Sequence, residues 1–222
     1  MHVRLMLAVV AAVCGLVVVP GTARSVPGIC PPFCDSIPDA AWIESSSLPL
    51  YPVYRWPGLA ALAVDAPAPR FGFEGWCASP TVADDPRDYV VAARAEVSNP
   101  DGQWNLRVQV LHWRGPVTAG GPIALETLEK ARMALALCHL TAPAVSPSIT
   151  SSDAERLATV ISDGGRRVMH AYLVADPRNG SLVEVALWST LPSAVEWSAV
   201  PDTQVFDAMA APLCAAYLGS CR

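Results

Sequence analysis

Three histidines, His112, His139 and His170, are the side chains of this chain best suited to moving a proton near neutral pH. None lies in a recognisable catalytic motif, because the sequence lacks a Gly-x-Ser-x-Gly elbow, a His-Glu-x-x-His pair and glycine-rich fingerprints for phosphates or dinucleotides. His112 and His170 fall on expected strands, so they could meet across a sheet, with Glu184 or Asp176 as an acid/base partner. A secreted hydrolase that uses His112 or His170 is therefore one functional hypothesis.

Cysteines form the second group of reactive side chains, and six of the seven follow an apolar leader segment. Redox or zinc chemistry at Cys30-Pro-Pro-Phe-Cys34 is disfavoured because the spacing is not Cys-x-x-Cys, the prolines oppose a helix and no second ligand pair accompanies it. We predict structural disulfides instead, while the sequence leaves other connectivities open. The preferred pairs are Cys30 with Cys34, Cys77 with Cys138, and Cys214 with Cys221.

Geometry places a condition on one of these pairs. On an unbroken helix Cys214 and Cys221 would lie about 10 Å apart, so their pairing requires the helix to end between them, at Gly219. A bridge between Cys77 and Cys138 would tie the first expected helix to a distant segment and stabilise the fold by roughly 4 kcal/mol.

The charged residues predict neither a metal site nor a nucleic-acid partner. The run Asp84-Asp85-Pro86-Arg87-Asp88 lacks the regular spacing of a calcium loop and is expected to be a solvated turn. The formal net charge is −5, and the basic pair Arg166-Arg167 follows a turn signal, so binding to DNA or RNA is not expected. No cofactor is predicted either.

The first 23 residues have the layout of a secretory signal peptide. Arg4 precedes an apolar run from Leu5 to Val19, and small residues precede a cleavage point near Ala23. About 15 apolar residues fall short of the roughly 20 that span a bilayer, so cleavage is favoured over retention as a signal anchor. The mature chain is expected to be secreted or held in the cell envelope, without a transmembrane helix, where disulfides persist.

Residues 24–69 form a second segment, which is rich in proline and aromatic residues and shows no helical or strand period. Proline fixes φ and biases the preceding residue towards extended conformations, so residues 48–57 are expected to be extended. Tyr51, Tyr54 and Trp56 are expected to clamp this strap onto the folded body; the alternative is a docking surface for a partner.

Residues 70–222 are expected to form a single α+β domain. Three turn dipeptides, Asp101-Gly102, Asp163-Gly164 and Asn179-Gly180, separate strand-like runs and predict hairpins. A further short strand over residues 70–76 is considered, although two glycines weaken it. The expected strands are Tyr89–Ser98, Gln103–Trp113, Arg156–Ser162, Arg166–Ala175 and Ser181–Ser189.

Two helices are expected to pack on this sheet. Apolar spacings of three and four predict one over Ile123–His139 and another from Asp202 or Thr203 to Leu218, which Pro212 should kink or restart. Gly120-Gly121-Pro122 is expected to turn into the first helix, and His139 to interact with the C-terminal end of that helix. The predicted fold is a twisted antiparallel sheet of about five strands, in the order β-β-α-β-β-β-α, with two packed helices and stapling disulfides.

The arginine-rich, lysine-poor composition, the leader, the paired cysteines and the helix ending Ala136-Leu137-Cys138-His139-Leu140 give a resemblance to small exported actinobacterial proteins of unknown function, of the mycobacterial type. The alternation of sheet and helix from residue 89 onward is also similar to the extracellular sensor domains of mycobacterial receptor kinases and to PsbP-like lipoprotein domains. These resemblances imply a non-catalytic extracytoplasmic module.

The leading functional hypothesis is accordingly a secreted or envelope-associated module that binds without catalysis. Most of the seven tryptophans are expected to pack in the core or at its rim, and some could line an apolar groove between sheet and helices. An apolar small-molecule ligand is therefore one expected class of ligand. A protein partner is the other expected class of ligand.

Overall fold

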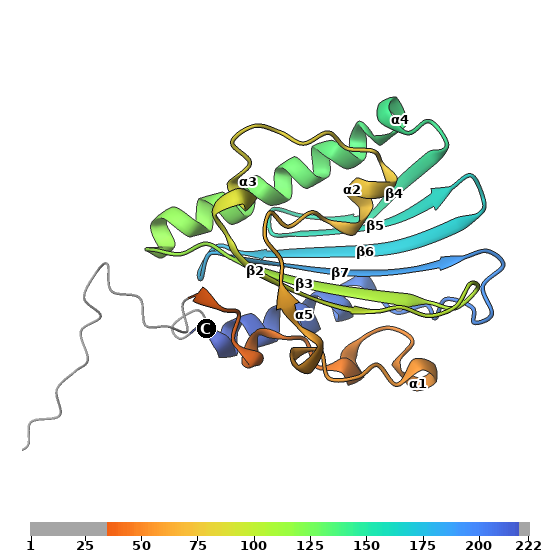
Figure 1. Ribbon diagram of the computed structural model, residues 1–222, viewed down its shortest axis with the longest axis horizontal. Coiled ribbons are helices and arrows are strands. Elements are labelled where there is room, and N and C mark those ends of the chain that lie inside the picture. Colours follow the sequence, from red (N-terminus) through yellow and green to blue (C-terminus); the bar gives the residue numbers. More distant parts are fainter. Residues whose placement is uncertain (1–34, 218–222) are drawn as a thin grey trace, which may run out of the picture.

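A seven-stranded antiparallel sheet forms the centre of the protein, whose computed structural model describes residues 35–217 (Figure 1). The strand order is β1-β2-β3-β7-β6-β5-β4, so within the described residues β1 and β4 are the sheet edges. The strands are β1 (Val64–Asp65), β2 (Val91–Val97), β3 (Asn105–His112), β4 (Val145–Ser152), β5 (Arg156–Asp163), β6 (Arg167–Asp176) and β7 (Ser181–Thr190).

The predicted α+β class with an antiparallel sheet is confirmed, and all five predicted strands are present as β2, β3, β5, β6 and β7. The expected number of strands was too low. β1 has only two residues, and β4 is a serine-rich, largely exposed edge strand with Pro147 inside it, so neither shows apolar alternation. The short strand considered over residues 70–76 is wrong, because Gly72–Trp76 forms helix α2.

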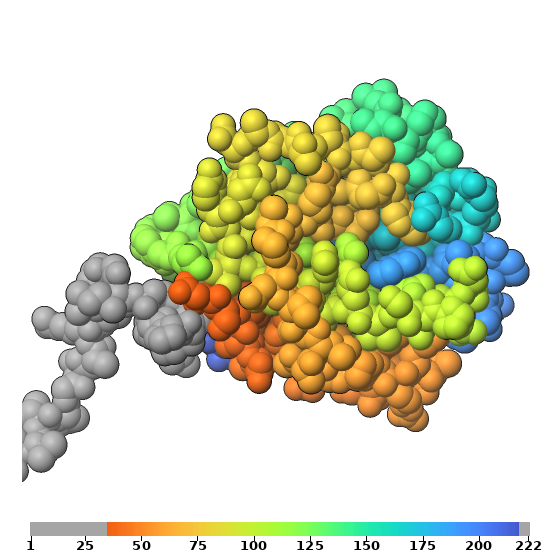
Figure 2. Space-filling view, in the orientation of Figure 1, coloured from red at the N-terminus to blue at the C-terminus, as the bar shows by residue number. Residues whose placement is uncertain are grey.

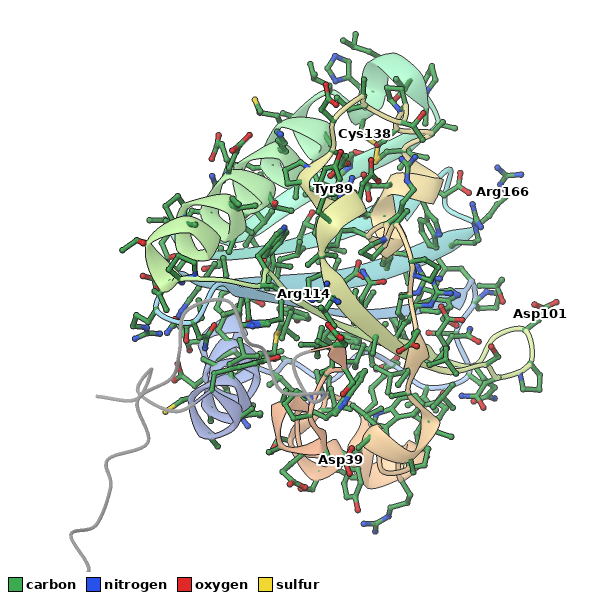
Figure 3. The ribbon with its side chains drawn as sticks, turned by 60° about the vertical axis from the view of Figure 1, so that its left-hand side comes forward. Asp39, Tyr89, Asp101, Arg114, Cys138 and Arg166 are labelled. Atoms are coloured by element: carbon green, nitrogen blue, oxygen red, sulfur yellow. A yellow bond between two sulfur atoms is a disulfide. The ribbon has the colours of Figure 1, made fainter. Side chains whose placement is uncertain are left out.

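The three predicted hairpins are present, and each contains a glycine in the left-handed region. Gly102, Gly164 and Gly180 have φ values of 78°, 54° and 67°, which glycine adopts without the steric cost that a Cβ would impose. Asp101, in the β2–β3 connection, and Arg166, in the β5–β6 connection, lie at the same end of the sheet (Figure 3).

One face of the sheet is covered by the upper layer, which consists of α2, α3 (Val117–Ala136), α4 (Cys138–Thr141) and residues 78–90 with the 3₁₀ helix η5 (Pro86–Tyr89) (Figure 1). The single helix predicted over 123–139 is therefore two helices, and the first begins six residues earlier than expected. The predicted turn at Gly120-Gly121 is wrong, since both glycines lie inside α3. A Cβ on Gly121 would be 2.2 Å from the Pro177 carbonyl oxygen, so glycine lets α3 lie against the β6–β7 turn.

The other face is covered by the lower layer, which consists of α5 (Asp202–Ala216) and residues 35–63. Pro212 lies inside α5, which continues to Ala216. The strap is not extended as expected, because it folds into short helices. These are η2 (Asp39–Ala41), η3 (Ser45–Ser47), α1 (Tyr51–Tyr54) and η4 (Ala60–Leu62).

The strap nevertheless clamps onto the body, as its aromatic residues predicted. Trp56 is buried, and its indole N–H donates to the Pro49 carbonyl at 2.8 Å. The Tyr54 ring stacks on Trp56 with centroids 4.7 Å apart, while its hydroxyl contacts Gln103 and the Trp104 amide. Residues 35–63 thus contribute seven buried side chains to the hydrophobic core: Ala41, Trp42, Ile43, Leu48, Leu50, Trp56 and Leu59.

Candidate functional site

An apolar groove lies in the upper layer, between α3 with α4 on one side and residues 79–87 on the other. Its volume is about 470 Å³, which falls in the range of small-molecule sites. Figure 2 shows the yellow segment that precedes β2 lying over this face of the molecule. Large apolar side chains that are exposed to solvent line the groove: Val82, Met133, Leu137 and Leu140.

The groove runs along α3, because its lining begins at Thr127 and continues through Leu137 to Thr141 on α4. At a rise of about 1.5 Å per helical residue, the stretch from Thr127 to Leu137 is roughly 15 Å long. Its large apolar side chains on this side are Met133, Leu137 and Leu140, and polar residues lie at both ends, with Thr127 at one and Thr141 at the other. The groove is therefore elongated, with an apolar middle.

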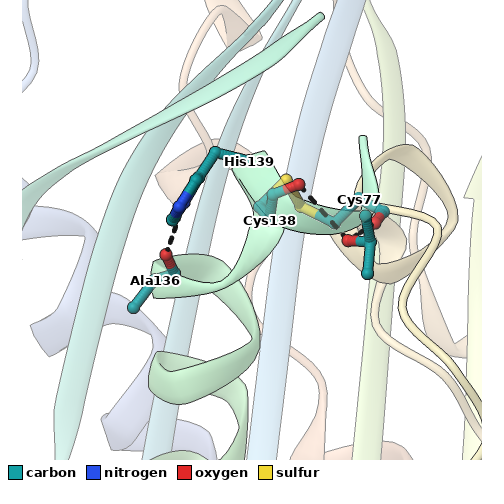
Figure 4. The surroundings of a disulfide bond; sticks show 5 residues. Cys77, Ala136, Cys138 and His139 are labelled. Atoms are coloured by element: carbon teal, nitrogen blue, oxygen red, sulfur yellow. Dashed lines mark hydrogen bonds between the residues drawn. A yellow bond between two sulfur atoms is a disulfide. The ribbon is translucent and has the colours of Figure 1, made fainter. Parts of the chain in front are cut away.

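The predicted disulfide between Cys77 and Cys138 is present and joins the two sides of the groove (Figure 4). Its Cα atoms are 4.8 Å apart, within the normal range for a disulfide. The Thr141 hydroxyl, on α4, donates to the Cys77 carbonyl and adds a second tie. His139 Nδ1 is 3.1 Å from the Ala136 carbonyl oxygen at the C-terminal end of α3. The predicted interaction of His139 with the end of this helix is therefore present.

The other predicted disulfides fall at least partly outside the described residues. Cys30 and Cys34 precede residue 35, and Cys221 follows residue 217. Cys214 is disulfide-bonded, but its predicted pairing with Cys221 stays a prediction. The predicted signal peptide, residues 1–23, also lies outside the described residues and stays a prediction.

Three charged side chains, the buried Glu74 and the partly buried Asp85 and Arg87, line the groove and are called its floor here. Arg87 donates to both carboxylate oxygens of Glu74, at 2.6 and 3.0 Å, and to both oxygens of Asp85, at distances from 2.6 to 3.1 Å. Burial opposes the charge on Arg87, but the hydrogen bonds to these two carboxylates outweigh it and raise its pKa. Burial likewise opposes the charge on Asp85, yet the Arg87 contacts outweigh it and lower the Asp85 pKa. The floor is ionised and internally paired.

Sequence reasoning missed this floor. The run 84–88 was expected to be a solvated turn, whereas Asp85 and Arg87 are directed into an ion-pair cluster. Glu74 was placed in a doubtful strand, but its carboxylate accepts the Phe71 N–H at 2.6 Å and so holds the first turn of α2. A carboxylate three residues after the N-cap, Phe71, was the local signal that could have revealed α2.

A second polar cluster lies beneath α2, where Glu184 on β7 is fully buried. The Gly72 N–H donates to its Oε1 at 2.6 Å, while its Oε2 has no hydrogen-bond partner among the described residues. Gln109 lies directly opposite on β3, is equally buried, and in the same part of the chain finds no partner for its amide oxygen or nitrogen. Burial raises the pKa of Glu184 to about 7 against the opposing charge of Arg107.

The two candidate catalytic histidines are not brought together. His170 pairs with Leu187, which pairs with Leu106, and Leu106 lies six residues along β3 from His112, or roughly 20 Å. Glu184 faces the upper layer, whereas both histidines face the lower layer beside α5 and Trp197. The expectation that they could share an acid/base partner at Glu184 is therefore wrong.

His112 does meet a serine and lies near Asp176 in the sheet. Its Nδ1 is 2.9 Å from Ser181 Oγ, its ring stacks on Tyr217 with centroids 4.2 Å apart, and burial lowers its pKa to about 4. In register Ser181 lies between His112 and Asp176, whereas a catalytic triad needs the histidine in the middle. Ser181 is also fully buried, so this arrangement offers no open nucleophile.

His170 is an aromatic packing residue. Its ring stacks on Trp197 with centroids 3.6 Å apart and lies 5.7 Å from the ring of Trp104. Burial lowers its pKa to about 4, so the imidazole is neutral near pH 7. The stack and the loss of charge explain why a histidine sits in an otherwise apolar cluster.

Comparison with protein-family models, with curated proteins and with solved structures finds no significant match to this chain. In residues 35–217, no three His, Cys, Asp or Glu side chains gather closely enough to hold a metal ion. Nor does any helix in that range combine the length and apolar character needed to cross a membrane.

Proposed function

We propose that this protein is an extracytoplasmic binding module whose groove beside the Cys77–Cys138 disulfide holds an apolar chain, without catalysis. The observation that carries the proposal is the groove itself, about 470 Å³ in volume and walled by exposed apolar side chains. Exposed apolar side chains that gather in a concave site mark ligand or partner surfaces.

The charges around the groove favour an uncharged occupant. Arg87 is already paired with Glu74 and Asp85, and Lys130 at the groove edge pairs with Glu126 at 2.8 Å. An anionic head group would meet cations whose charge is already balanced by these carboxylates. The apolar chain of a neutral lipid or a similar uncharged molecule needs only the apolar walls, so this is the ligand class that we propose.

The hydrolase hypothesis receives less support from the geometry. Catalysis by His112 or His170 needs an accessible nucleophile or water within hydrogen-bond reach. His112 contacts the fully buried Ser181, and His170 is stacked against Trp197. The groove and the two histidines also lie in different layers of the protein.

The disulfide supports the proposed compartment. A buried bridge between Cys77 and Cys138 is consistent with an oxidising, extracytoplasmic environment. Export through the leader and relationship to exported actinobacterial proteins belong to the same proposal, and localisation of an epitope-tagged chain tests them.

Binding of N-phenyl-1-naphthylamine, an uncharged fluorescent probe, to the purified exported chain tests the proposed site. We expect saturable binding that Leu137→Glu weakens by about tenfold or more, since a carboxylate in an apolar wall must be desolvated. Leu137 is 54% exposed, so the variant should fold. Val53→Glu is the matched control, because Val53 is 58% exposed on α1 in the lower layer. Absence of binding, or equal weakening by both variants, would count against the groove.

Native mass spectrometry of the freshly purified protein identifies the natural occupant. A bound neutral lipid that is missing from Leu137→Glu and retained by Val53→Glu would support the proposal. An empty wild-type protein that also fails to take up neutral lipid from vesicles would exclude this ligand class.

A further inference from the structure

Glu184 and Gln109 present three buried polar atoms without partners among the described residues, all beneath the first turn of α2. Burying a polar atom without a hydrogen bond is costly, so the arrangement needs an explanation. The two side chains lie directly opposite each other on β7 and β3, which places them on the same face of the sheet.

A neutral Glu184 gives two of these atoms a partner. When Glu184 Oε2 carries a proton it is a donor, and Gln109 Oε1 across the strand pair is an acceptor without a partner. Glu184 Oε1 keeps its hydrogen bond from the Gly72 amide in this state. Gln109 Nε2 can donate to an ionised Oε2 in the same way, so Gln109 offers a hydrogen bond to either state. The protonated acid differs in that it places no charge in the fully buried site.

An ionised Glu184 is opposed by its surroundings. The charged groups that face it are Arg107 on β3, Glu74 on α2 and Arg87 on η5. Arg107 is engaged with Glu96 at 2.6 Å, and Arg87 is shared by Glu74 and Asp85. The α3 residues that face the sheet are uncharged, and so are the neighbouring residues Leu173 and Ala186. Burial, helped by the charge of Glu74, outweighs the two arginines and the hydrogen bond from the Gly72 amide, so the pKa of Glu184 is raised.

Solvent can reach this carboxyl only if something moves, and the segment on top of it is α2. Gly72 lies against Glu184 and Ala186, with atoms of both 3.5 Å from the position of a Cβ. The same segment carries Phe71 and Glu74, which line the groove. The Cys77–Cys138 disulfide fixes the end of the segment, so a movement that admits water has to take place at its start, where Phe71 is packed in the core.

We propose that α2 is a proton-controlled latch on the groove, closed over neutral Glu184 in acid and loosened when Glu184 ionises. The effect of the latch on ligand binding rests on the proposed function of the groove. The movement of α2 itself depends only on Glu184, Gln109 and Gly72. Linkage gives the direction, since a group that holds its proton more tightly in the closed state favours closure at low pH.

The test uses N-phenyl-1-naphthylamine with the full chain at about pH 5.5 and about pH 8.5, on either side of the expected transition. We expect wild-type affinity to fall by about fivefold or more towards the higher pH, and Glu184→Gln to keep its low-pH affinity throughout. Glutamine keeps the shape and supplies a permanent donor to Gln109. Wild-type affinity that is independent of pH, or a Glu184→Gln variant that responds like wild type, would overturn the latch.

A second measurement needs no ligand and separates this inference from the proposed function. Hydrogen-exchange protection of the Gly72–Trp76 amides, relative to amides of β6, should fall with rising pH in wild type and stay constant in Glu184→Gln. If the probe does not bind at any pH but α2 protection changes as stated, the proposed function fails and the latch stands. Constant protection in both proteins would refute the latch.

Should Glu184→Gln not fold, ¹³C NMR of the Glu184 carboxyl in the wild-type chain gives the same answer. Titration near neutral pH together with loss of α2 protection supports the latch, and titration at an ordinary glutamate pKa contradicts it.

Discussion

The upper and lower layers cover the same sheet, yet they bury different kinds of side chain. The lower layer is held by aromatic rings whose polar atoms are satisfied, as when the Trp104 indole N–H donates to the Val195 carbonyl at 2.8 Å. The upper layer holds the disulfide, the ion-pair floor of Arg87, and the partnerless atoms of Glu184 and Gln109. The lower layer is built for packing, and the upper layer carries the features expected of a site.

Because of this difference, substitutions in the two layers can separate effects on stability from effects on binding. The lower layer stabilises the fold through aromatic packing, and its own pocket, of about 350 Å³ and lined by residues 39–45 and 58–61, is smaller than the groove. In the upper layer the disulfide adds stability to the apolar packing, whereas ion pairs withdrawn from water contribute little net stability. Variants in the two layers should therefore differ in their effect on binding even where their effects on stability are similar.

The largest effect is expected from removing the disulfide, by Cys77→Ala combined with Cys138→Ala. The bridge spans 61 residues, and its loss should lower the free energy of unfolding by about 4 kcal/mol. Urea denaturation followed by tryptophan fluorescence measures the change. Probe binding should weaken as well, since the two groove walls lose their link. A loss of stability below about 1 kcal/mol would show that the upper layer does not depend on the bridge.

In the lower layer, Met209→Ala on α5 is expected to cost about 3 kcal/mol, because Met209 is almost fully buried and its removal leaves a cavity. The same urea experiment measures the loss. Probe affinity, measured under conditions where the variant is folded, should equal that of the wild type. A weakened affinity would mean that the two layers are coupled and that the contrast between them is wrong.

The docking of α3 depends on a close backbone approach, which Gly121→Ala tests. The new Cβ would be 2.2 Å from the Pro177 carbonyl oxygen, so we expect a loss of about 2 kcal/mol from forced displacement of the helix. Gly75→Ala on α2 is the control, because no atom lies within 4 Å of its Cβ position, and it should be neutral or slightly stabilising. Thermal unfolding of both variants decides, and equal melting temperatures would contradict the close approach.

Gly121 also shows why some elements of the fold could be predicted from the sequence and others could not. Hairpin turns such as Asn179-Gly180 are local signals, because positive φ at a glycine needs no knowledge of distant residues. The predicted start of α3 was wrong because the Gly120-Gly121 sequence resembles a turn. The role of Gly121 depends on its contact with Pro177, which is 56 residues further along the chain.

The candidate site was less predictable than the fold for the same reason. Glu74 and Arg87 are 13 residues apart, and nothing in either local sequence indicates that they meet. Gln109 and Glu184 become neighbours only through the register of β3 and β7, which the sequence did not define. Cys77 and Cys138 were the exception, since cysteine chemistry limits the partners that a side chain can have.

The smallest effect is a pH dependence of opposite sign in the two layers. His170 has its pKa lowered from 6.5 to about 4 by burial, so its contribution to stability is present above the unfolded pKa and is lost as the pH falls. Glu184 has its pKa raised from 4.5 to about 7, so its contribution is present in acid and is lost as the pH rises through neutrality.

Each group should change the free energy of unfolding by about 1 kcal/mol per pH unit between its unfolded and folded pKa values, which are about 6.5 and 4 for His170 and about 4.5 and 7 for Glu184. The two slopes have opposite signs and overlap between about pH 4.5 and 6.5. We expect His170→Phe, which keeps an aromatic ring against Trp197, to reduce the loss of stability towards acid pH, to which His112 also contributes. Glu184→Gln should remove the fall in stability between about pH 6.5 and 7, above the unfolded pKa of the histidines. Urea titrations at successive pH values measure both slopes. If His170→Phe changed the slope above about pH 6.5, or Glu184→Gln left it unchanged, the proton linkage would have been assigned to the wrong layer.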